Sequence, residues 1–440
     1  MSSSRRTLGR VGAIAVAVVL IGGAYLAGRK DLHPMQWISR LGSQRDSLRL
    51  AQTLYERCGR LGGERKVTCY SGPLDSLAGR GDVRIAMGAL SRIGTLDQDV
   101  KRDGHVFAHG IGIAGGKSGG DIAQTFAMCD ESWQSGCYHG VIQAYFAAAK
   151  KIGPDEVNAL CQPFRGPGAD MWIRFQCVHG MGHGLEMIYA HDLPKSLTGC
   201  DFLGEEWDRR SCYGGVFMEN IVNVTMPKHP AHDLMAHADS EMPGMDMTGM
   251  DHDAAPPYKA IDPADPLYPC STMADKYLVA CYEMQTSVML YLNHGNIGAT
   301  AKTCDTAPLR MRFICYQSLG RDISSYALQD HKRSIEMCSL GTPQYQPWCY
   351  FGLVKNFIDL NARASDGLTF CKELTGDDNK MKCYEAVGEQ IGTLRNQAEQ
   401  RQELCTPAEP AYLQACLFGA RVSPTAPAAL VRLNAEPNGG

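Results

Sequence analysis

Apolar residues recur at helical spacing through most of the chain, and they do so in units that repeat. The clearest units lie between Cys304 and Cys349, where an apolar-periodic run separates two pairs of cysteines. The first cysteines of these pairs, Cys304 and Cys338, are 34 residues apart, and the second cysteines keep the same interval. Strand-type alternation of apolar and polar residues is scarce, so the pattern predicts an all-α fold. A period of 34 residues is typical of helix-turn-helix units that stack on one another.

The cysteines extend this pattern over most of the chain. All 18 fall into consecutive pairs, and none is left over: Cys58 with Cys69, Cys129 with Cys137, Cys161 with Cys177, Cys200 with Cys212, Cys270 with Cys281, Cys304 with Cys315, Cys338 with Cys349, Cys371 with Cys383, and Cys405 with Cys416. Sequence alone does not determine disulfide connectivity, but this regular order favours local bridges. We interpret the first cysteine of a pair as the end of helix A and the second as the start of helix B, so that each disulfide closes one hairpin.

The period and the hairpin arrangement resemble those of the tetratricopeptide-like superfamily of helical repeats, over roughly residues 45–425. The Trp, Leu-Gly-Tyr and Pro signature of that superfamily is absent, and the cysteine pairs are a departure from it. The resemblance implies a right-handed solenoid of about ten helix-turn-helix repeats, and it implies no activity.

The N-terminus differs from the repeats and suggests a compartment. A basic stretch up to Arg10 precedes 17 apolar residues, Val11 to Ala27. This pattern suits a signal anchor, and we predict that residues 1–30 hold the rest of the chain outside the cytoplasm, on the periplasmic side of the inner membrane. Nine predicted disulfides agree with an oxidising compartment. Zinc-type Cys-x-x-Cys spacing is absent.

The rest of the chain divides by composition. We expect helical repeats at residues 31–225, a flexible insertion at 226–268, further repeats at 269–425 and a disordered tail at 426–440. The formal net charge is −4 and the pI about 6.4, so no basic field points to nucleic acid. Neither a nucleophile elbow nor a phosphate-binding loop nor a dinucleotide fingerprint occurs.

Three successive units carry histidine at one equivalent position. With Phe107 in the place of a missing second cysteine, the units align as FAHG, CYHG and CVHG. We call the second residue after the helix-B cysteine position +2; it is His109, His139 and His179 in these units. Later units carry glycine, Glu283, Gln317, Phe351, Glu385 or Phe418 there. Because equivalent positions of stacked units lie in a row, the three imidazoles are expected to converge.

Two further histidines strengthen this prediction. His105 and His183 each lie four residues from a histidine of the row, on the same face of a helix. We predict a shared metal or catalytic site, with Glu186, Met218 and Glu219 as further candidates. The structural alternative is that the histidines cap helices or bond to carbonyl groups in the core. Several glycines near these histidines indicate close approach either of helices or of a ligand. Three of them lie outside the glycine position that the repeats share, and we count them as stronger signs of a ligand: Gly112, Gly182 and Gly184.

The insertion between Cys212 and Cys270 is rich in Met, His, Asp and Pro. It resembles the Met/His-rich segments of periplasmic copper-resistance and copper-trafficking proteins, and this resemblance implies copper. Thioethers suit Cu(I), and imidazoles suit both oxidation states of copper. The alternative is a disordered linker. The metal ligands that we predict here are His229, His232, His237, Met242, Met245, Met247, Met250 and His252.

Three functions follow from these patterns. The first is an exported, membrane-anchored copper-binding protein for copper handling or tolerance, in which the loop captures metal and the helical histidines hold it. The second is an enzyme that depends on copper or another transition metal. The third is a scaffold for an envelope complex that binds a protein partner on the solenoid surface, with incidental metal binding.

Overall fold

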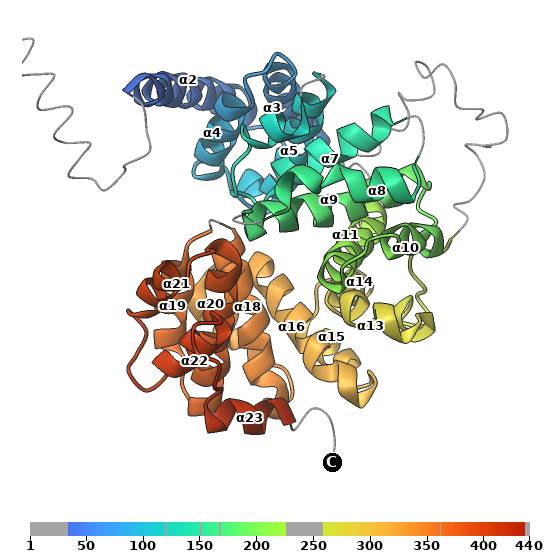
Figure 1. Cartoon of the computed structure of the whole chain (residues 1–440), viewed down its shortest axis with the longest axis vertical. Coiled ribbons are helices and arrows are strands. Elements are labelled where there is room, and N and C mark those ends of the chain that lie inside the picture. Colours follow the sequence, from blue (N-terminus) through green and yellow to red (C-terminus); the bar gives the residue numbers. More distant parts are fainter. Residues whose placement is uncertain are drawn as a thin grey trace, which may run out of the picture.

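The computed structural model describes residues 34–118, 121–149, 152–166, 169–225, 258–360 and 362–435, with side chains from residue 44 onward. Within these residues the chain is all-α, as predicted, and contains no strand (Figure 1). None of the described helices is long and apolar enough to cross a bilayer. The predicted anchor, residues 1–30, lies outside the described part of the chain.

In most of the predicted hairpins a short A helix precedes a longer B helix. In the N-terminal half, residues 34–225, the elements are α2 (Pro34–Cys58), α3 (Gly63–Ala78), α4 (Val83–Gly94), α5 (Gln98–Lys117), α6 (Ile122–Phe126), α7 (Gly136–Ala148), α8 (Pro154–Leu160), η1 (Gln162–Phe164), α9 (Met171–Ile188), α10 (Leu193–Asp201) and α11 (Glu206–Thr225). Asp or Asn side chains cap several helices by accepting hydrogen bonds from backbone N–H groups, as Asp97 does for α5 and Asp170 for α9.

The C-terminal half, residues 258–435, continues the same alternation. Its elements are η2 (Cys270–Thr272), α13 (Asp275–Tyr282), α14 (Gln285–Leu292), α15 (Ile297–Cys304), α16 (Leu309–Tyr326), α17 (His331–Cys338), η3 (Pro343–Tyr345), α18 (Gln346–Asp359), α19 (Ala364–Glu373), α20 (Asp377–Leu394), α21 (Ala398–Cys405), α22 (Leu413–Gly419) and α23 (Ala428–Ala435). The prediction of a disordered tail at 426–440 is wrong for residues 428–435, which form α23. This helix is held in place by the burial of Leu430 and Leu433.

Nine disulfides join the cysteines in the predicted pairs, and no cysteine is free. The first cysteine usually lies at the end of helix A, as expected. The prediction that the second cysteine starts helix B is wrong for most pairs. In six units the second cysteine is the seventh residue of its helix: Cys69, Cys177, Cys212, Cys281, Cys315 and Cys383. In two further units, those of Cys349 and Cys416, it is the fourth residue.

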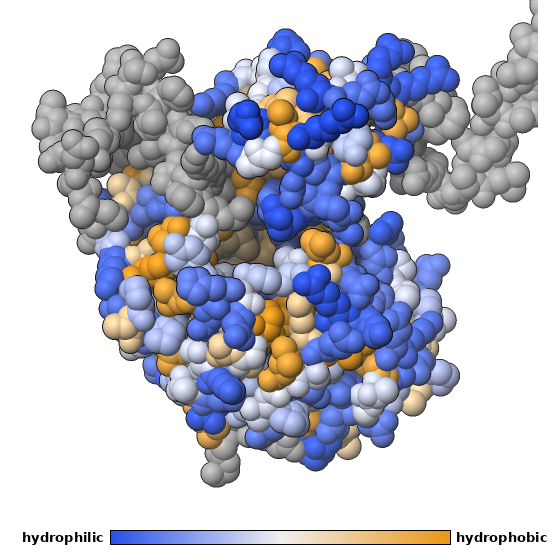
Figure 2. All heavy atoms as spheres, turned by 180° about the vertical axis from the view of Figure 1, so that it is seen from behind, coloured by the Kyte–Doolittle hydropathy of each residue, from blue (hydrophilic) through white to orange (hydrophobic). Residues whose placement is uncertain are grey.

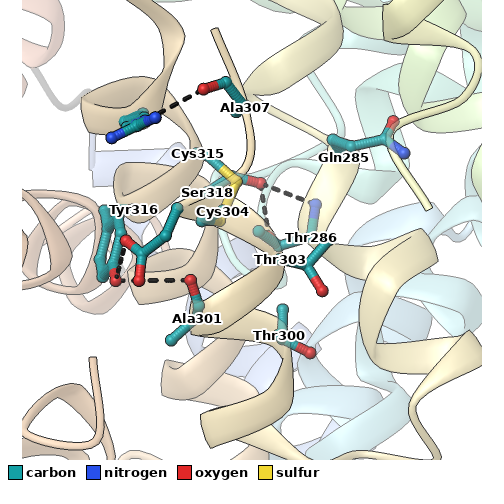
Figure 3. The surroundings of a disulfide bond; sticks show 12 residues. Gln285, Thr286, Thr300, Ala301, Thr303, Cys304, Ala307, Cys315, Tyr316 and Ser318 are labelled. Atoms are coloured by element: carbon teal, nitrogen blue, oxygen red, sulfur yellow. Dashed lines mark hydrogen bonds between the residues drawn. A yellow bond between two sulfur atoms is a disulfide. The ribbon is translucent and has the colours of Figure 1, made fainter. Parts of the chain in front are cut away.

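The position of the bridges has a simple geometric reason. The loop of a hairpin runs away from the C-terminal end of helix A. Helix B returns past this end, and its second helical turn lies beside the first cysteine. Cys304 and Cys315 are brought within 5.6 Å of each other, measured between their Cα atoms, in this way. Figure 3 shows this bridge, where Tyr316 donates a hydrogen bond to the carbonyl oxygen of Ala301 at 3.4 Å. In the three histidine-bearing units, position +2 therefore lies beyond the first three residues of its helix, where a side chain cannot act as an N-cap.

Pairs of adjacent B helices cross at reciprocal glycines. A Cβ on Gly112 of α5 would overlap the carbonyl oxygen of Cys137, and one on Gly140 of α7 would overlap that of His109. Gly182 of α9 and Gly215 of α11 repeat this arrangement, as do other pairs further on: Gly320 with Gly352, and Gly388 with Gly419. The interpretation of Gly112 and Gly182 as signs of a ligand is thus wrong, since both allow close contact of helix backbones.

The prediction for Gly184 is corrected in the same way. A Cβ at this residue would overlap the ring of Phe146, which packs against α9. The glycines near the histidines therefore explain how the helices approach each other. They allow position +2 of one helix to lie next to the following helix. Close helix packing, rather than a bound ligand, therefore explains why so many glycines occur here.

The two halves meet directly, beyond the contacts between neighbouring hairpins. Gln134 donates to the side chain of Asn356 at 2.7 Å, and the backbone N–H of Trp133 donates to the carbonyl oxygen of Leu360 at 3.2 Å. Asn396, just after α20, bonds to the backbone of Ala169 just before α9. In Figure 1 the green and blue helices lie above the orange and red ones, and from behind the surface is hollowed between them (Figure 2).

The buried apolar residues form two cores. The smaller one extends from Ala51 to Cys137, and the larger one from Ile113 to Leu433. Both cores take apolar residues from α5 and α7, the two helices that carry His105, His109 and His139.

Candidate metal centre

Five histidines from three helices form one group, which we call the histidine cluster: His105 and His109 of α5, His139 of α7, and His179 and His183 of α9. The ring centroid of His139 lies 5.4 Å from that of His109 and 5.0 Å from that of His179. The row of position +2 therefore converges as the sequence predicts. His105 and His183 join it, with ring centroids 5.7 and 5.0 Å from His139.

Backbone carbonyl groups hold one ring nitrogen in two of the five imidazoles. Nδ1 of His105 lies 2.7 Å from the carbonyl oxygen of Trp133, and Nδ1 of His179 lies 3.2 Å from that of Ser211. A carbonyl oxygen only accepts, so both Nδ1 atoms carry the proton. Trp133 starts a left-handed turn, with φ of 57°, just before α7.

Side-chain oxygens hold one ring nitrogen in the other three. Nδ1 of His183 donates to the Glu219 carboxylate at 2.7 Å, and Nε2 of His139 donates to Oε1 of Gln176 at 3.0 Å. Gln143 donates its amide to Glu219 at 3.3 Å. This contact orients its Oε1 toward Nδ1 of His109, which lies 3.1 Å away.

Each imidazole therefore has one N–H bonded to an oxygen, and its second nitrogen carries a lone pair. Proteins orient metal-binding histidines in this way, because a second hydrogen bond fixes the tautomer and the ring plane. Nδ1 of His139 and Nε2 of His183 are buried and have no hydrogen-bond partner. Buried polar atoms in this condition are rare and call for an explanation.

Burial lowers the pKa of four of these imidazoles and keeps them neutral. His109 is 0% exposed and His183 is 1% exposed. Loss of solvent lowers the pKa of His105, lowers those of His139 and His179 further, and brings the pKa of His183 to about 3. The contact between His183 and Glu219 is therefore a hydrogen bond to a neutral imidazole, although its geometry is also that of an ion pair. Neutral imidazole is the form that binds metals.

Two overlapping triads have the spacing of a metal site. His105, His109 and His139 form one, and His139, His179 and His183 form the other. In each triad the ligand atoms lie within 4.8 Å of one another, so the histidines are placed to hold a metal ion. His139 belongs to both triads.

The other candidates near the cluster take different positions. Glu219, rather than Met218, contacts His183, and Met218 is only half-buried. Glu186 is fully buried, and loss of solvent raises its pKa to about 8, so the carboxyl group is neutral at pH 7. Neither Glu186 nor Glu219 belongs to a triad.

All eight predicted loop ligands lie outside the described residues. They are His229, His232, His237, Met242, Met245, Met247, Met250 and His252. The last part of the predicted insertion, residues 258–268, forms turns that pack on the C-terminal half. Gln285, at the start of α14, donates hydrogen bonds to the carbonyl oxygens of Pro266 and Tyr268 at 2.9 and 2.8 Å.

A small cavity borders the cluster at the junction of the two halves. Its volume is about 20 Å³, enough for about one water molecule. Its lining comes from both halves: Lys101, Arg102, His105, Trp133, Gln134, Ser325, Leu328, Gln329 and Leu360. His105 is half-buried, whereas the other four histidines are at most 6% exposed. The cluster thus approaches the surface at His105.

Sequence reasoning missed the groups that orient the imidazoles. Gln143 and His183 both lie six residues after a helix-B cysteine, so the repeat register could have placed Gln143 near the cluster. Gln176 and the carbonyl groups of Trp133 and Ser211 have no such signal. Neither a protein-family model nor a curated protein nor a solved structure matches this chain, so its own geometry is the basis for a functional conclusion.

Proposed function

We propose that this chain is an exported, membrane-anchored copper-binding protein that acts in copper handling or tolerance. The observation that carries the proposal is the histidine cluster, in which five imidazoles each have one N–H held by an oxygen. Nδ1 of His139 and Nε2 of His183 have no partner. Buried polar atoms in this condition destabilise a fold unless a ligand uses their lone pairs. A metal ion is the ligand that several imidazole lone pairs share best.

The choice of copper rests on ligand chemistry. All 18 cysteines are in disulfides, so thiolate ligands are absent and imidazole and thioether remain. Nine disulfides favour an oxidising compartment, which agrees with export past an N-terminal anchor. In the proposed mechanism the Met/His-rich loop captures copper, and the histidine cluster holds it.

Metal analysis of the purified full-length chain tests this proposal. The chain is loaded with copper, dialysed and compared with two variants by mass spectrometry. One carries H109A, H139A and H179A; the other carries alanine at the four loop histidines and leucine at Met242, Met245, Met247 and Met250. We expect the loop variant to keep stoichiometric copper and the triple variant to lose it from the helical site. Copper that depends only on the loop would contradict a role for the cluster.

A second candidate function is a metal-dependent enzyme. The cavity beside His105 favours it, because a catalytic metal needs an open position for substrate or water. Turnover of a redox substrate by the copper-loaded chain, lost in H105A but with copper retained, would support this function.

A further inference from the structure

The two triads of the cluster are not independent, because His139 has only one nitrogen to offer. Its Nε2 donates to Gln176, so Nδ1 is the atom with the free lone pair. One lone pair of a neutral imidazole binds one ion. When an ion takes His139 into one triad, the other triad is left with two histidines.

The charge of the surroundings agrees with a single ion. In the described part of the chain, Glu219 is the carboxylate that hydrogen-bonds to the cluster. Glu219 accepts a hydrogen bond from Nδ1–H of His183. It also accepts one from the amide of Gln143, whose Oε1 bonds to His109. One negative charge is thus shared by both ends of the cluster, and it compensates one monovalent cation. A second cation in this buried site would be opposed by strong repulsion.

The triads also differ in depth and regularity. The ring centroids of His139, His179 and His183 lie 5.0, 5.0 and 5.1 Å apart, close to an equilateral triangle. Those of His105, His109 and His139 lie 4.6, 5.4 and 5.7 Å apart, and His105 borders the cavity at the junction. The first triad is the inner one, and the second is the outer one.

We infer that the cluster holds a single soft monovalent cation at one of two alternative positions, and that the ion passes from the outer triad to the inner triad through His139. The outer triad receives the ion at the cavity beside His105, and the inner triad retains it. This inference rests on the proposed function, since it requires that the cluster binds metal. It adds the number of ions, their charge and the order of the steps.

Silver(I) is a suitable probe, because it is monovalent, soft and redox-inactive. The full-length chain is used with its loop ligands replaced as above, so that bound silver reports on the helical site. Silver content after dialysis gives the stoichiometry, and stopped-flow competition with a coloured chelator gives loading and release rates. The variants are H105A for the outer triad, H183A for the inner triad and H139A for the shared ligand, each repeated with asparagine to preserve the fold.

We expect one silver ion per chain. H105A keeps that ion but loads at least about tenfold more slowly, whereas H183A loads at the normal rate and releases at least about tenfold faster. H139A loses retention. H331A is the matched control, because His331 bonds to Glu373 and belongs to neither triad, and it should change nothing.

Two results would overturn the inference while leaving the proposed function intact. One is a stoichiometry of two silver ions in the unmodified cluster. The other is an equal loss of retention in H105A and H183A, which would mean one rigid five-histidine site. Absence of silver from the unmodified cluster would instead contradict the proposed function itself.

Discussion

The same structural position carries different chemistry in the two halves of the molecule. In the N-terminal half, position +2 holds the histidine row, whose rings converge on His139. In the C-terminal half the position holds Glu283, Gln317, Phe351, Glu385 and Phe418. Helices of both halves cross at reciprocal glycines, so this backbone arrangement recurs while the side chains at position +2 differ. Glu283 is an exception, because it follows the end of α13.

At position +2 of the C-terminal half, the buried carboxylate of Glu385 has a charged partner. Glu385 pairs with Lys382, which is only 3% exposed and also donates to Asn434 at 3.0 Å. The ammonium group of Lys382 lies 4.7 Å from the ring centroid of Phe351, a neighbour along the row. In the N-terminal half the acceptors hold one nitrogen of each imidazole, and lone pairs such as those of His139 and His183 stay unsatisfied. A buried polar group with its hydrogen bonds satisfied, such as Glu385, indicates a structural role. Buried lone pairs without a partner indicate that a ligand binds there.

The largest expected effect comes from the glycine crossings that both halves share. G182A and G320A should each lower the free energy of unfolding by about 3 kcal/mol, because a Cβ would overlap a carbonyl oxygen of the next helix. Only G182A should also weaken metal retention, since it displaces α9. Urea unfolding and metal analysis measure both effects. The control is G72A, where a Cβ meets nothing within 4 Å; wild-type stability in G182A would contradict the close crossing.

The next largest effect is expected for E385Q, which tests whether the Glu385 carboxylate has a purely structural role. E385Q removes the charge that pairs with buried Lys382, and should destabilise the fold by about 2 kcal/mol without changing metal content. Denaturant unfolding and metal analysis of the same preparation provide the test. A loss of metal in this variant would show that the two halves are not chemically distinct.

E219Q is the matching change in the N-terminal half. It weakens the acceptor that holds Nδ1 of His183 and orients Gln143, and should lower metal affinity about 10- to 100-fold. Competition with a chelator of known affinity measures the change. An unchanged affinity would mean that the hydrogen bonds around the cluster do not support metal binding.

The smallest effect concerns Asp359 of α18. Loss of solvent raises its pKa from 3.8 to about 7, so the folded protein binds this proton more tightly than the unfolded chain does. Stability therefore falls as the pH rises from 4 to 7 and the carboxyl group ionises. D359N should stabilise the protein by about 1 kcal/mol at pH 8, since solvent screens this half-buried group. Unfolding at pH 4 should show no gain, and an equal gain at both pH values would contradict this assignment.

Much of the scaffold is predictable because its signals are local and repeated. The cysteine order predicts all nine disulfides, and the 34-residue period places His109, His139 and His179 in one row. Both inferences need only the repeat register, in which equivalent residues take equivalent positions. The helix boundaries are less predictable. Cys69 lies well inside the helix that it was expected to start, and Cys281 lies near the end of its helix.

The remainder depends on contacts that no local pattern encodes. The carbonyl groups of Trp133 and Ser211 orient two imidazoles, and every residue type has a carbonyl. Contacts between the halves, such as Gln134 with Asn356, join residues 222 positions apart. Gly182 was open to two interpretations, helix packing or a ligand, and only the crossing of α9 and α11 distinguishes them.

X-ray absorption spectroscopy of the full-length chain with its loop intact tests the central claim most directly. The chain is loaded with one equivalent of Cu(I) under reducing but disulfide-preserving conditions. We expect three nitrogen ligands with the multiple scattering of imidazole and no sulfur neighbour, because the preorganised cluster should outcompete the loop. Sulfur in the first coordination sphere would place the copper on the methionines, and would contradict the claim that the histidine cluster is the metal centre.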